Sequence, residues 1–353
     1  MSGGFPGRGS LLVSAFTGEA ILHGMRLSGR RRVLVSAGML LAAPFAAIAR
    51  PRTKLARIGV LVVPPAFDYQ ARTDALRAGL RDLGYVEGVN AQIELRSAEG
   101  RFDRLPELAA ELVRQNVDVI VVAGTPAIRA VKQSTATIPV VIAAVGDAVA
   151  GGHVQSLSHP GGNVTGSTYF APELATKQLE LLKEIFPKLS RVAVVFNPSN
   201  PAGRATVQAV ESSARSLGLE LERFPVREPQ DFDGAIASIG KTRYRTGLII
   251  DDPITIANAK ALADLSVKHR VAAGANFIEY VEAGGFMAYG VNLTAMWRRA
   301  AYFVDKILKG TDPGSIPVER ATRFDLVVNR KAAAALEISL APAIFLRADR
   351  VIE

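Results

Sequence analysis

Short apolar runs alternate with amphipathic segments through most of the chain, and this alternation limits what the chain can fold into. The first run, 57–63, reads RIGVLVV, and Leu76, Leu80 and Leu83 follow it at helical spacing. Strands that regularly alternate with helices pair in parallel, because each helix returns the chain to the same end of the sheet. The pattern therefore predicts an α/β fold with a parallel sheet covered on both faces.

The alternation occurs twice, in two consecutive units of about four strands each. A chain of 353 residues is long for one compact domain and suits two. We therefore expect two doubly wound, Rossmann-like lobes. The expected strands are 57–63, 92–96, 117–123 and 139–145 in the first unit, and 192–196, 220–226, 246–250 and 271–275 in the second.

The N-terminus has the features of an export signal. Arg30, Arg31 and Arg32 precede an apolar run over 33–48, and the run ends in a small-x-small site at 47–49. About 16 residues are too few to span a bilayer, so residues 1–49 are expected to be an extension and a cleaved signal peptide. The twin-arginine and general secretion routes both remain open, as do Met1 and Met25 as the start.

Charge and cysteine usage narrow the functional class. Of the 42 basic and 33 acidic residues, five basic and one acidic lie within 1–49, which leaves a net charge of +5 on the remainder. This modest charge gives no support to nucleic-acid binding. The chain has no Cys, which excludes disulfides and a lipidated N-terminal Cys. We expect a periplasmic protein without a lipid anchor.

Catalytic and cofactor motifs are absent from the sequence. His153, His159 and His269 lack metal-ligand spacing, and neither a G-x-S-x-G elbow nor a G-x-G-x-x-G turn occurs. We therefore expect no catalytic residue, no metal and no cofactor.

Polar residues follow the expected strands of both units. Ligands of open α/β sheets bind beyond the carboxyl ends of the strands, where Thr125, Asp147, Asn197, Asp251 and Asp252 lie. Thr125 starts a helix whose free N–H groups favour an anion, and Asp147 or Asp251 could pair with an ammonium group. The same residue types also cap helices. Aromatic candidates for a ligand's apolar part are Phe67, Tyr69, Phe277 and Tyr289.

A glycine-rich stretch, SLSHPGGNVTG over 156–166, separates the two units. Pro160 and the glycine pair permit a sharp change of path, so the stretch is interpreted as the start of a hinge. We expect NVTG to lead into a first crossover, MAYG to lie near a second, and the FDLVV strand to form the third. His159 is interpreted as a turn residue.

Several ordered motifs resemble a known family. The segment LRDLGYVEGVNAQIEL, the turns AGTPA and AAVGDAV, SLSHPGGNVTG, VEAGGFMAYG and the closing FLRADRVIE together resemble the ABC-transporter substrate-binding proteins of the tryptophan/tyrosine type, over about 57–353. The resemblance implies the type I periplasmic-binding-protein fold, in which three crossover strands join two lobes around a ligand cleft. It places the first lobe at 55–166 plus 285–322 and the second at 167–284 plus 323–353.

The resemblance also assigns candidate ligand residues. The Gly124–Thr125 and Gly146–Asp147 turns match ligand loops of the first lobe, and Asn197 and Asp251 lie at matching strand ends of the second. Asp252 remains an alternative to Asp251. The chain departs from the family at Ala148, where the family usually has Pro after the Gly-Asp pair. The expected ligand-binding residues are Phe67, Thr125, Gly146, Asp147, Asn197, Asp251 and Tyr289.

The leading hypothesis is a monomeric solute-binding subunit of an ABC importer. It would close by a hinge on a small polar solute, an amino acid of the aromatic type in the characterised relatives, and deliver it to a permease and its ATPase in the inner membrane. Nucleic acid is not expected as a partner. A ligand sensor for a membrane receptor and an exported α/β enzyme are the alternatives, since a fold does not define a function.

Overall fold

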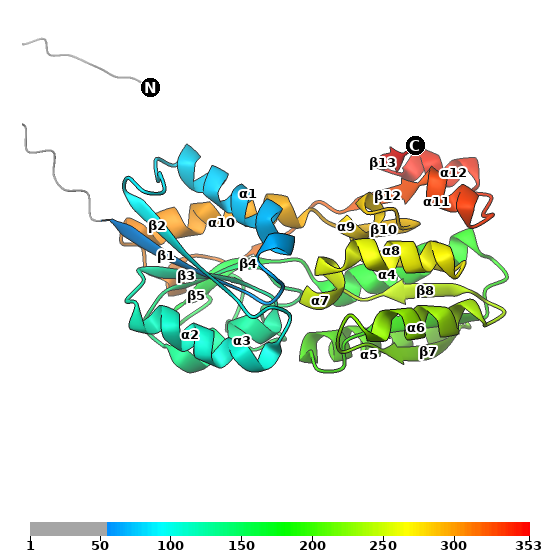
Figure 1. The fold of residues 1–353 in the computed structure, drawn as a ribbon, viewed down its shortest axis with the longest axis horizontal. Helices are drawn as coiled ribbons and strands as arrows, with labels where there is room; N and C mark the ends of the chain where they lie inside the picture. The colour runs from blue at the N-terminus through cyan, green and yellow to red at the C-terminus, as the bar shows by residue number, and fades with distance from the viewer. Residues whose placement is uncertain (1–54) are drawn as a thin grey trace, which may run out of the picture. The chain divides into compact units, whose positions relative to one another are not determined.

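The computed structural model describes residues 55–353, which form two α/β lobes, each built on its own sheet (Figure 1). The N-terminal extension and the expected signal peptide lie outside the described residues. The first sheet has six strands in the order β11-β5-β4-β3-β1-β2, and every recorded pairing in it is parallel. Its strands are β1 (Ala56–Val62), β2 (Ala91–Ser97), β3 (Val119–Ala123), β4 (Val140–Ala144), β5 (Val164–Thr168) and β11 (Glu319–Arg320).

Helices cover both faces of the first sheet because its strands are apolar on both sides. On β1, Ile58 and Val60 pack into one core cluster, while Leu61 packs into a second cluster on the opposite face. In Figure 1, α1 and α10 cover one face and α2 and α3 the other. These helices are α1 (Gln70–Asp82), α2 (Leu105–Arg114), α3 (Thr125–Ser134) and α10 (Leu293–Leu308), with short 3-10 turns η1 (Phe67–Tyr69), η2 (Phe102–Arg104) and η3 (Pro313–Ser315).

The second sheet has seven strands in the order β13-β12-β10-β9-β8-β6-β7. Its pairings are parallel except for the antiparallel pair of β10 and β12. The strands are β6 (Arg191–Phe196), β7 (Glu220–Pro225), β8 (Thr246–Ile249), β9 (Ala272–Phe277), β10 (Met287–Val291), β12 (Asp325–Asn329) and β13 (Arg350–Ile352).

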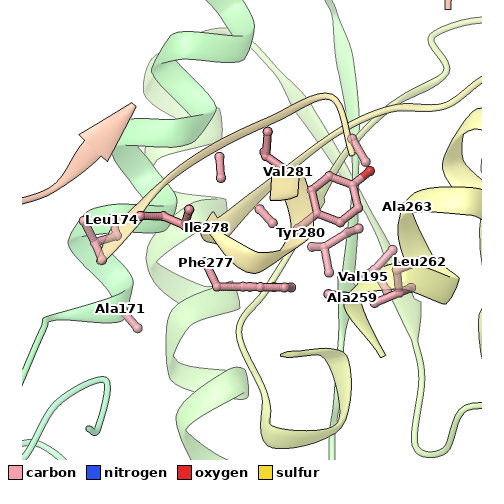
Figure 2. Packing of buried hydrophobic residues seen from close by; sticks show 14 of the residues in the cluster. Ala171, Leu174, Val195, Ala259, Leu262, Ala263, Phe277, Ile278, Tyr280 and Val281 are labelled. Carbon is pink, nitrogen blue, oxygen red and sulfur yellow. The ribbon is translucent and has the colours of Figure 1, made fainter. Parts of the chain in front are cut away.

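The helices of the second lobe form two layers around this sheet. Figure 2 shows one core, where Phe277 and Tyr280 pack beside Val195 and Leu262, with the two rings 6.3 Å apart. Burying side chains of this size contributes roughly 1.5–3 kcal/mol each. The helices are α4 (Ala171–Ile185), α5 (Pro201–Ser216), α6 (Asp231–Gly240), α7 (Pro253–Ala257), α8 (Ala259–Lys268), α9 (Glu279–Glu282), α11 (Arg330–Ala335) and α12 (Pro342–Arg347).

Three connections cross between the lobes, which confirms the predicted fold class. They join β5 to α4, β10 to α10, and β11 to β12. Two predicted boundaries need correction. The first lobe does not end at 166, because β5 continues to Thr168, and residues 287–291 do not belong to it, because β10 pairs with β9 and β12 of the second sheet. The third boundary, 322/323, lies within the third connection.

The glycine-rich stretch before β5 makes the turn that its composition indicates. Gly161 and Gly162 have φ values of 67° and 63°, which L side chains rarely adopt. His159 is exposed, and its Nδ1 lies 3.1 Å from the hydroxyl of the neighbouring Ser158. Asn163 donates its side-chain N–H to the carbonyl of Ile138, and β5 begins one residue later. The stretch therefore leads into the first crossover.

Candidate ligand-binding site

A small cavity lies where the carboxyl ends of strands from both lobes meet. Its volume is about 40 Å³, room for only a few water molecules, and a second cavity of about 130 Å³ adjoins it. The lobes touch here, because a Cβ placed on Gly124 would lie 3.0 Å from Cγ of Pro253. The polar residues of the first cavity include Thr125 and Tyr69 from the first lobe, Tyr169 from the first crossover, and Asn200, Asp251 and Asp252 from the second lobe.

Asp251 follows β8, and its carboxylate lines the cavity. Tyr169 donates its hydroxyl to Oδ2 at 2.5 Å, and Asn276 donates its amide N–H to Oδ1 at 2.6 Å. Asn276 Oδ1 accepts the backbone N–H of Asp251 in return, at 2.8 Å. No Lys or Arg within residues 55–353 forms an ion pair with Asp251. Burial raises the pKa of this carboxyl despite the two donors.

Asp252 has a structural role instead, because its hydrogen-bonding capacity is used within the protein. Its carboxylate accepts N–H groups from Asn197, Asn200 and Ile254 at 2.9–3.2 Å. Thr255 Oγ1 accepts the backbone N–H of Asp252 in return, which completes a capping box at the start of α7. Burial raises the pKa of Asp252 to about 6. The structure thus distinguishes two neighbouring acids that the sequence left as alternatives.

Thr125 lies across the cavity at the start of α3. The turn before it depends on Gly124, whose φ is 77°. The Thr125 side chain is 3% exposed, and its hydroxyl lies 3.5 Å from Nε2 of the buried His153. Burial lowers the pKa of His153 to about 4, so this imidazole is neutral near pH 7. The first N–H groups of α3 lack helical partners and favour an anion beside the hydroxyl.

A charged and aromatic cluster lies beside the cavity and joins the two lobes. Arg72 of α1 donates to Glu279 of α9 at 2.8 Å, and its guanidinium stacks over the ring of Tyr69 at 4.6 Å. Tyr69 also makes an edge-on contact with Trp297, with ring centroids 5.2 Å apart. Tyr69 therefore lines the cavity with its ring held from two sides.

The structure brings together some of the predicted residues and not others. Thr125, Gly146 and Asp251 line the first cavity, and Asp147 lines the adjoining one, where its Oδ1 accepts two backbone N–H groups of its own loop. Asn197 lies behind Asp252 rather than in the lining.

Two predicted aromatic residues do not reach the cavity. Phe67 is 84% exposed, and Tyr289 packs against Phe324 at 6.2 Å. Phe67 belongs to the predicted loop, but Tyr69, two residues on, is the aromatic residue of that loop that lines the cavity. Among the residues outside the predicted set, Tyr169 follows the glycine-rich stretch, whereas Asn276 is identified only by its contact with Asp251.

Other classes of site receive no support from the part of the chain that the structure describes. Residues 55–353 contain no group of three or more acidic or His side chains arranged to hold a metal ion. The helices of the same residues are too short or too polar to cross a membrane.

Two lobes joined by three crossings, with a polar cavity between them, define the type I periplasmic-binding-protein fold. Residues 57–352 match the family model of the ABC transporter substrate binding protein, and the chain belongs to this family. The family is one of solute-binding proteins rather than enzymes.

Individual relatives agree with this assignment. The chain is 26% identical to a tyrosine-binding protein of Clostridioides difficile over 80% of each chain. A conserved domain protein of Vibrio cholerae has a crystal structure that superposes with a TM-score of 0.79, at 28% identity over 84% of this chain and 100% of that one. A Streptococcus pneumoniae ABC domain in complex with L-Trp superposes with a TM-score of 0.77, at 23% identity over 84% and 99%.

Proposed function

We propose that this protein is the extracytoplasmic solute-binding subunit of an ABC importer and that it binds an α-amino acid in the cavity between its lobes. The observation that carries the proposal is the half-buried Asp251 carboxylate, which lines the cavity and has no cationic partner within residues 55–353. Buried charges in proteins are normally paired, so a ligand with a cationic group would supply the missing charge.

The opposite side of the cavity suits the carboxylate of the same ligand. An α-amino acid places its ammonium and carboxylate groups on one carbon, and Asp251 and the Thr125 turn face the same small cavity. The Thr125 hydroxyl and the first N–H groups of α3 would bind the carboxylate. The adjoining cavity, lined partly by Arg129 and Asp147, would accommodate the side chain. The tyrosine-binding relative and the L-Trp complex support an amino acid with an aromatic side chain.

Closure of the lobes would couple binding to transport. The L-Trp complex superposes with a TM-score of 0.77, whereas a ligand-free, open substrate-binding protein of Clostridium difficile superposes with 0.61, at 23% identity in both cases. This difference and the Gly124–Pro253 contact favour a closed arrangement. Ligand that contacts both lobes would shift the population toward the closed form, which docks on a permease.

We further propose a periplasmic location and an inner-membrane partner for the protein. A signal peptide within residues 1–49 would direct the protein to the periplasm, where a monomer without a lipid anchor would deliver ligand to an inner-membrane permease and its ATPase. A ligand sensor would use the same cavity but a receptor in place of the permease. Neighbouring genes for a permease and an ATPase favour the importer, and a receptor gene in their place favours the sensor.

Calorimetric titration with the proteinogenic amino acids and their decarboxylated amines tests the binding proposal. We expect one amino acid, or a small aromatic set, to bind, and the matching amine to bind at least about tenfold more weakly because the Thr125 side loses its anion. Asp251→Asn should abolish binding, whereas Asp264→Asn, an exposed acid paired with Lys260, should leave it unchanged. Equal affinity of wild type and Asp251→Asn would refute the cavity assignment.

A further inference from the structure

A second hollow opens on the second lobe, away from the ligand cavity. It is a groove of about 890 Å³ at the amino ends of β6, β8 and β9, whereas the ligand cavity lies beyond carboxyl ends of the strands. The groove and the ligand cavity share no lining residue. Any ligand of this groove would therefore bind at a separate site.

The groove is strongly basic. Six cationic side chains line it and only two carboxylates do so. The basic residues come from three separate segments of the chain, 188–191, 241–245 and Arg270. The cations are Lys188, Arg191, Lys241, Arg243, Arg245 and Arg270, and the acids are Glu222 and Glu337.

Most of these cations lack an anionic partner within residues 55–353. Arg191 pairs with Glu220 at 2.5 Å and Arg270 with Glu337 at 3.4 Å. The other four side chains are exposed and form no ion pair within residues 55–353. Glu222 accepts the hydroxyl of Tyr244 at 2.6 Å. The groove therefore keeps an excess of unpaired positive charge.

Helix ends at this edge explain only part of the charge. The partial negative charge at a helix C-terminus attracts cations within the last turn, and Lys241 is the C-cap of α6. Arg243 and Arg245 lie two and four residues beyond that cap. The partial charge at the end of α6 therefore does not account for Arg243 and Arg245.

Backbone conformation gives a second, independent indication. Arg245, Arg270 and Glu337 have φ values of 42°, 55° and 59°, in the left-handed region that Gly or Asn adopts more easily. Three of the six non-Gly residues with positive φ within 55–353 thus line this one groove. Arg270 and Glu337 directly follow the C-caps of α8 and α11, where left-handed residues are common, so among the unpaired cations the conformational cost falls on Arg245.

The shape of the groove suits a discrete ligand. Its lining includes the half-buried Phe186, Tyr244 and Ile338 between the cationic side chains. A concave lining of this kind encloses a small molecule, whereas a flat bilayer surface would reach only the rim. From the unpaired cations, the strained backbone and the concavity, we infer that the groove binds a soluble polyanion carrying phosphate groups, through Lys188, Lys241, Arg243 and Arg245. This inference does not depend on the proposed transport function.

Inorganic tripolyphosphate is the probe for a direct test. In low-salt buffer we expect saturable binding by calorimetry and a rise of several degrees in Tm, both weakened by added NaCl. Arg243→Asn/Arg245→Asn should bind at least about tenfold more weakly, since removing one charge-assisted hydrogen bond lowers affinity by roughly that factor. Asn tolerates the left-handed conformation at 245, so this variant should fold normally.

Matched controls separate the groove from general charge and from the ligand cavity. Arg114→Asn/Arg227→Asn removes the same charge from exposed arginines that form no ion pair within 55–353, and it should bind tripolyphosphate like wild type. Asp251→Asn should also bind it normally. The inference is overturned if wild type shows no saturable binding, or if the two double variants bind equally.

Vesicles distinguish a soluble ligand from a lipid headgroup. We expect no cosedimentation with phosphatidylglycerol vesicles beyond that with phosphatidylcholine vesicles at physiological salt. Cosedimentation with phosphatidylglycerol that the Arg243→Asn/Arg245→Asn variant loses would overturn the assignment of a soluble ligand.

Discussion

The guanidinium of Arg72 lies 2.8 Å from the Glu279 carboxylate, and this ion pair joins the two lobes. The two side chains are 6% and 22% exposed, so the pair is largely shielded from water. Arg72 Nε and Glu279 Oε2 are buried without a hydrogen-bond partner within residues 55–353. The pair can form only when α1 and α9 approach, which links its energy to closure.

Glu279→Gln is expected to favour the open form. The substitution leaves the Arg72 charge buried in the closed form, whereas opening would return it to water. We expect ligand affinity to fall about 10- to 100-fold, mainly through faster dissociation, as measured by stopped-flow fluorescence. Glu282→Gln is the control, because Glu282 pairs with Arg350 within the second lobe and is half exposed. Equal dissociation rates in the two variants would show that the pair does not hold the lobes together.

Tyr69 and Phe67 are expected to behave oppositely although they are two residues apart. Tyr69 is buried against Trp297 and Arg72, so Tyr69→Ala should lower the free energy of unfolding by about 3–5 kcal/mol in urea titrations and weaken ligand binding. Phe67→Ala removes an exposed ring and should change stability by less than about 0.5 kcal/mol. Weaker ligand binding by Phe67→Ala at unchanged stability would place that ring in the ligand site after all.

Gly166 is expected to be the least replaceable glycine of the first crossover. Its φ is 131°, and a Cβ there would lie 2.1 Å from the carbonyl oxygen of Ile142 on the neighbouring strand. Gly166→Ala should therefore separate β4 from β5 and lower the free energy of unfolding by more than about 2 kcal/mol. Gly162→Ala also has positive φ but meets open space, and it should cost only about 1 kcal/mol. If Gly166→Ala and Gly162→Ala lower stability by similar amounts in thermal unfolding, the steric explanation is wrong.

Periodicity predicted the elements whose signal is local. Helix α3 begins at Thr125, as expected, and β3 and β4 lie within expected strands. Two strands next to the crossings, β5 and β10, are not among the strands that periodicity predicts. β5 reads VTGST, which is mostly polar, and β10 reads MAYGV, which is apolar but contains Gly290 and follows Gly284 and Gly285; each becomes a strand through its neighbours in the sheet. The helical segment after β8 consists of two helices, α7 and α8, which meet at Asn258, whose side-chain amide donates to the Ile254 carbonyl.

The candidate site was predictable where its residues follow from topology. Thr125 and Asp251 were identified because parallel strands place their carboxyl ends at one edge. Contacts between distant segments were not predictable in this way. Tyr169 and Asp251 are 82 residues apart, and Arg72 and Glu279 are 207 apart, so no local pattern connects them.

The pH dependence of stability should contain two opposing contributions. Burial lowers the pKa of His153 to about 4, so the unfolded chain binds an extra proton between about pH 6.5 and 4. His153 therefore makes the free energy of unfolding fall as pH falls through this range. Burial raises the pKa of Asp252 to about 6, so the folded chain binds an extra proton between about pH 6 and 3.8, which adds stability as pH falls. The two shifts are similar in size and should largely cancel.

Asp252→Asn should expose the contribution of His153. Asn can still cap α7, so the variant should fold. The difference between its free energy of unfolding and that of wild type should shift against the variant by about 2 kcal/mol between pH 7 and pH 4.5. His153→Gln should show the reverse trend, with relative stability rising over the same range. Urea titrations at several pH values measure both. If stability depends on pH in the same way in wild type and Asp252→Asn, then His153 and Asp252 do not make opposing contributions.

Ligand affinity should depend on pH through Asp251. Burial raises the pKa of this carboxyl, and only its ionised form can pair with an ammonium group, so affinity should fall with acidification at a higher pH than an ordinary Asp would produce. Calorimetric Kd values between pH 8 and pH 4.5 should rise toward the acid end, with a slope of at most about tenfold per pH unit, since one proton competes with the ligand. Tyr169→Phe removes a donor to the carboxylate and should move this loss to higher pH. Thr125→Ala should weaken binding at every pH without moving the curve. A Kd that stays constant down to pH 4.5 would mean that Asp251 does not bind the ammonium group.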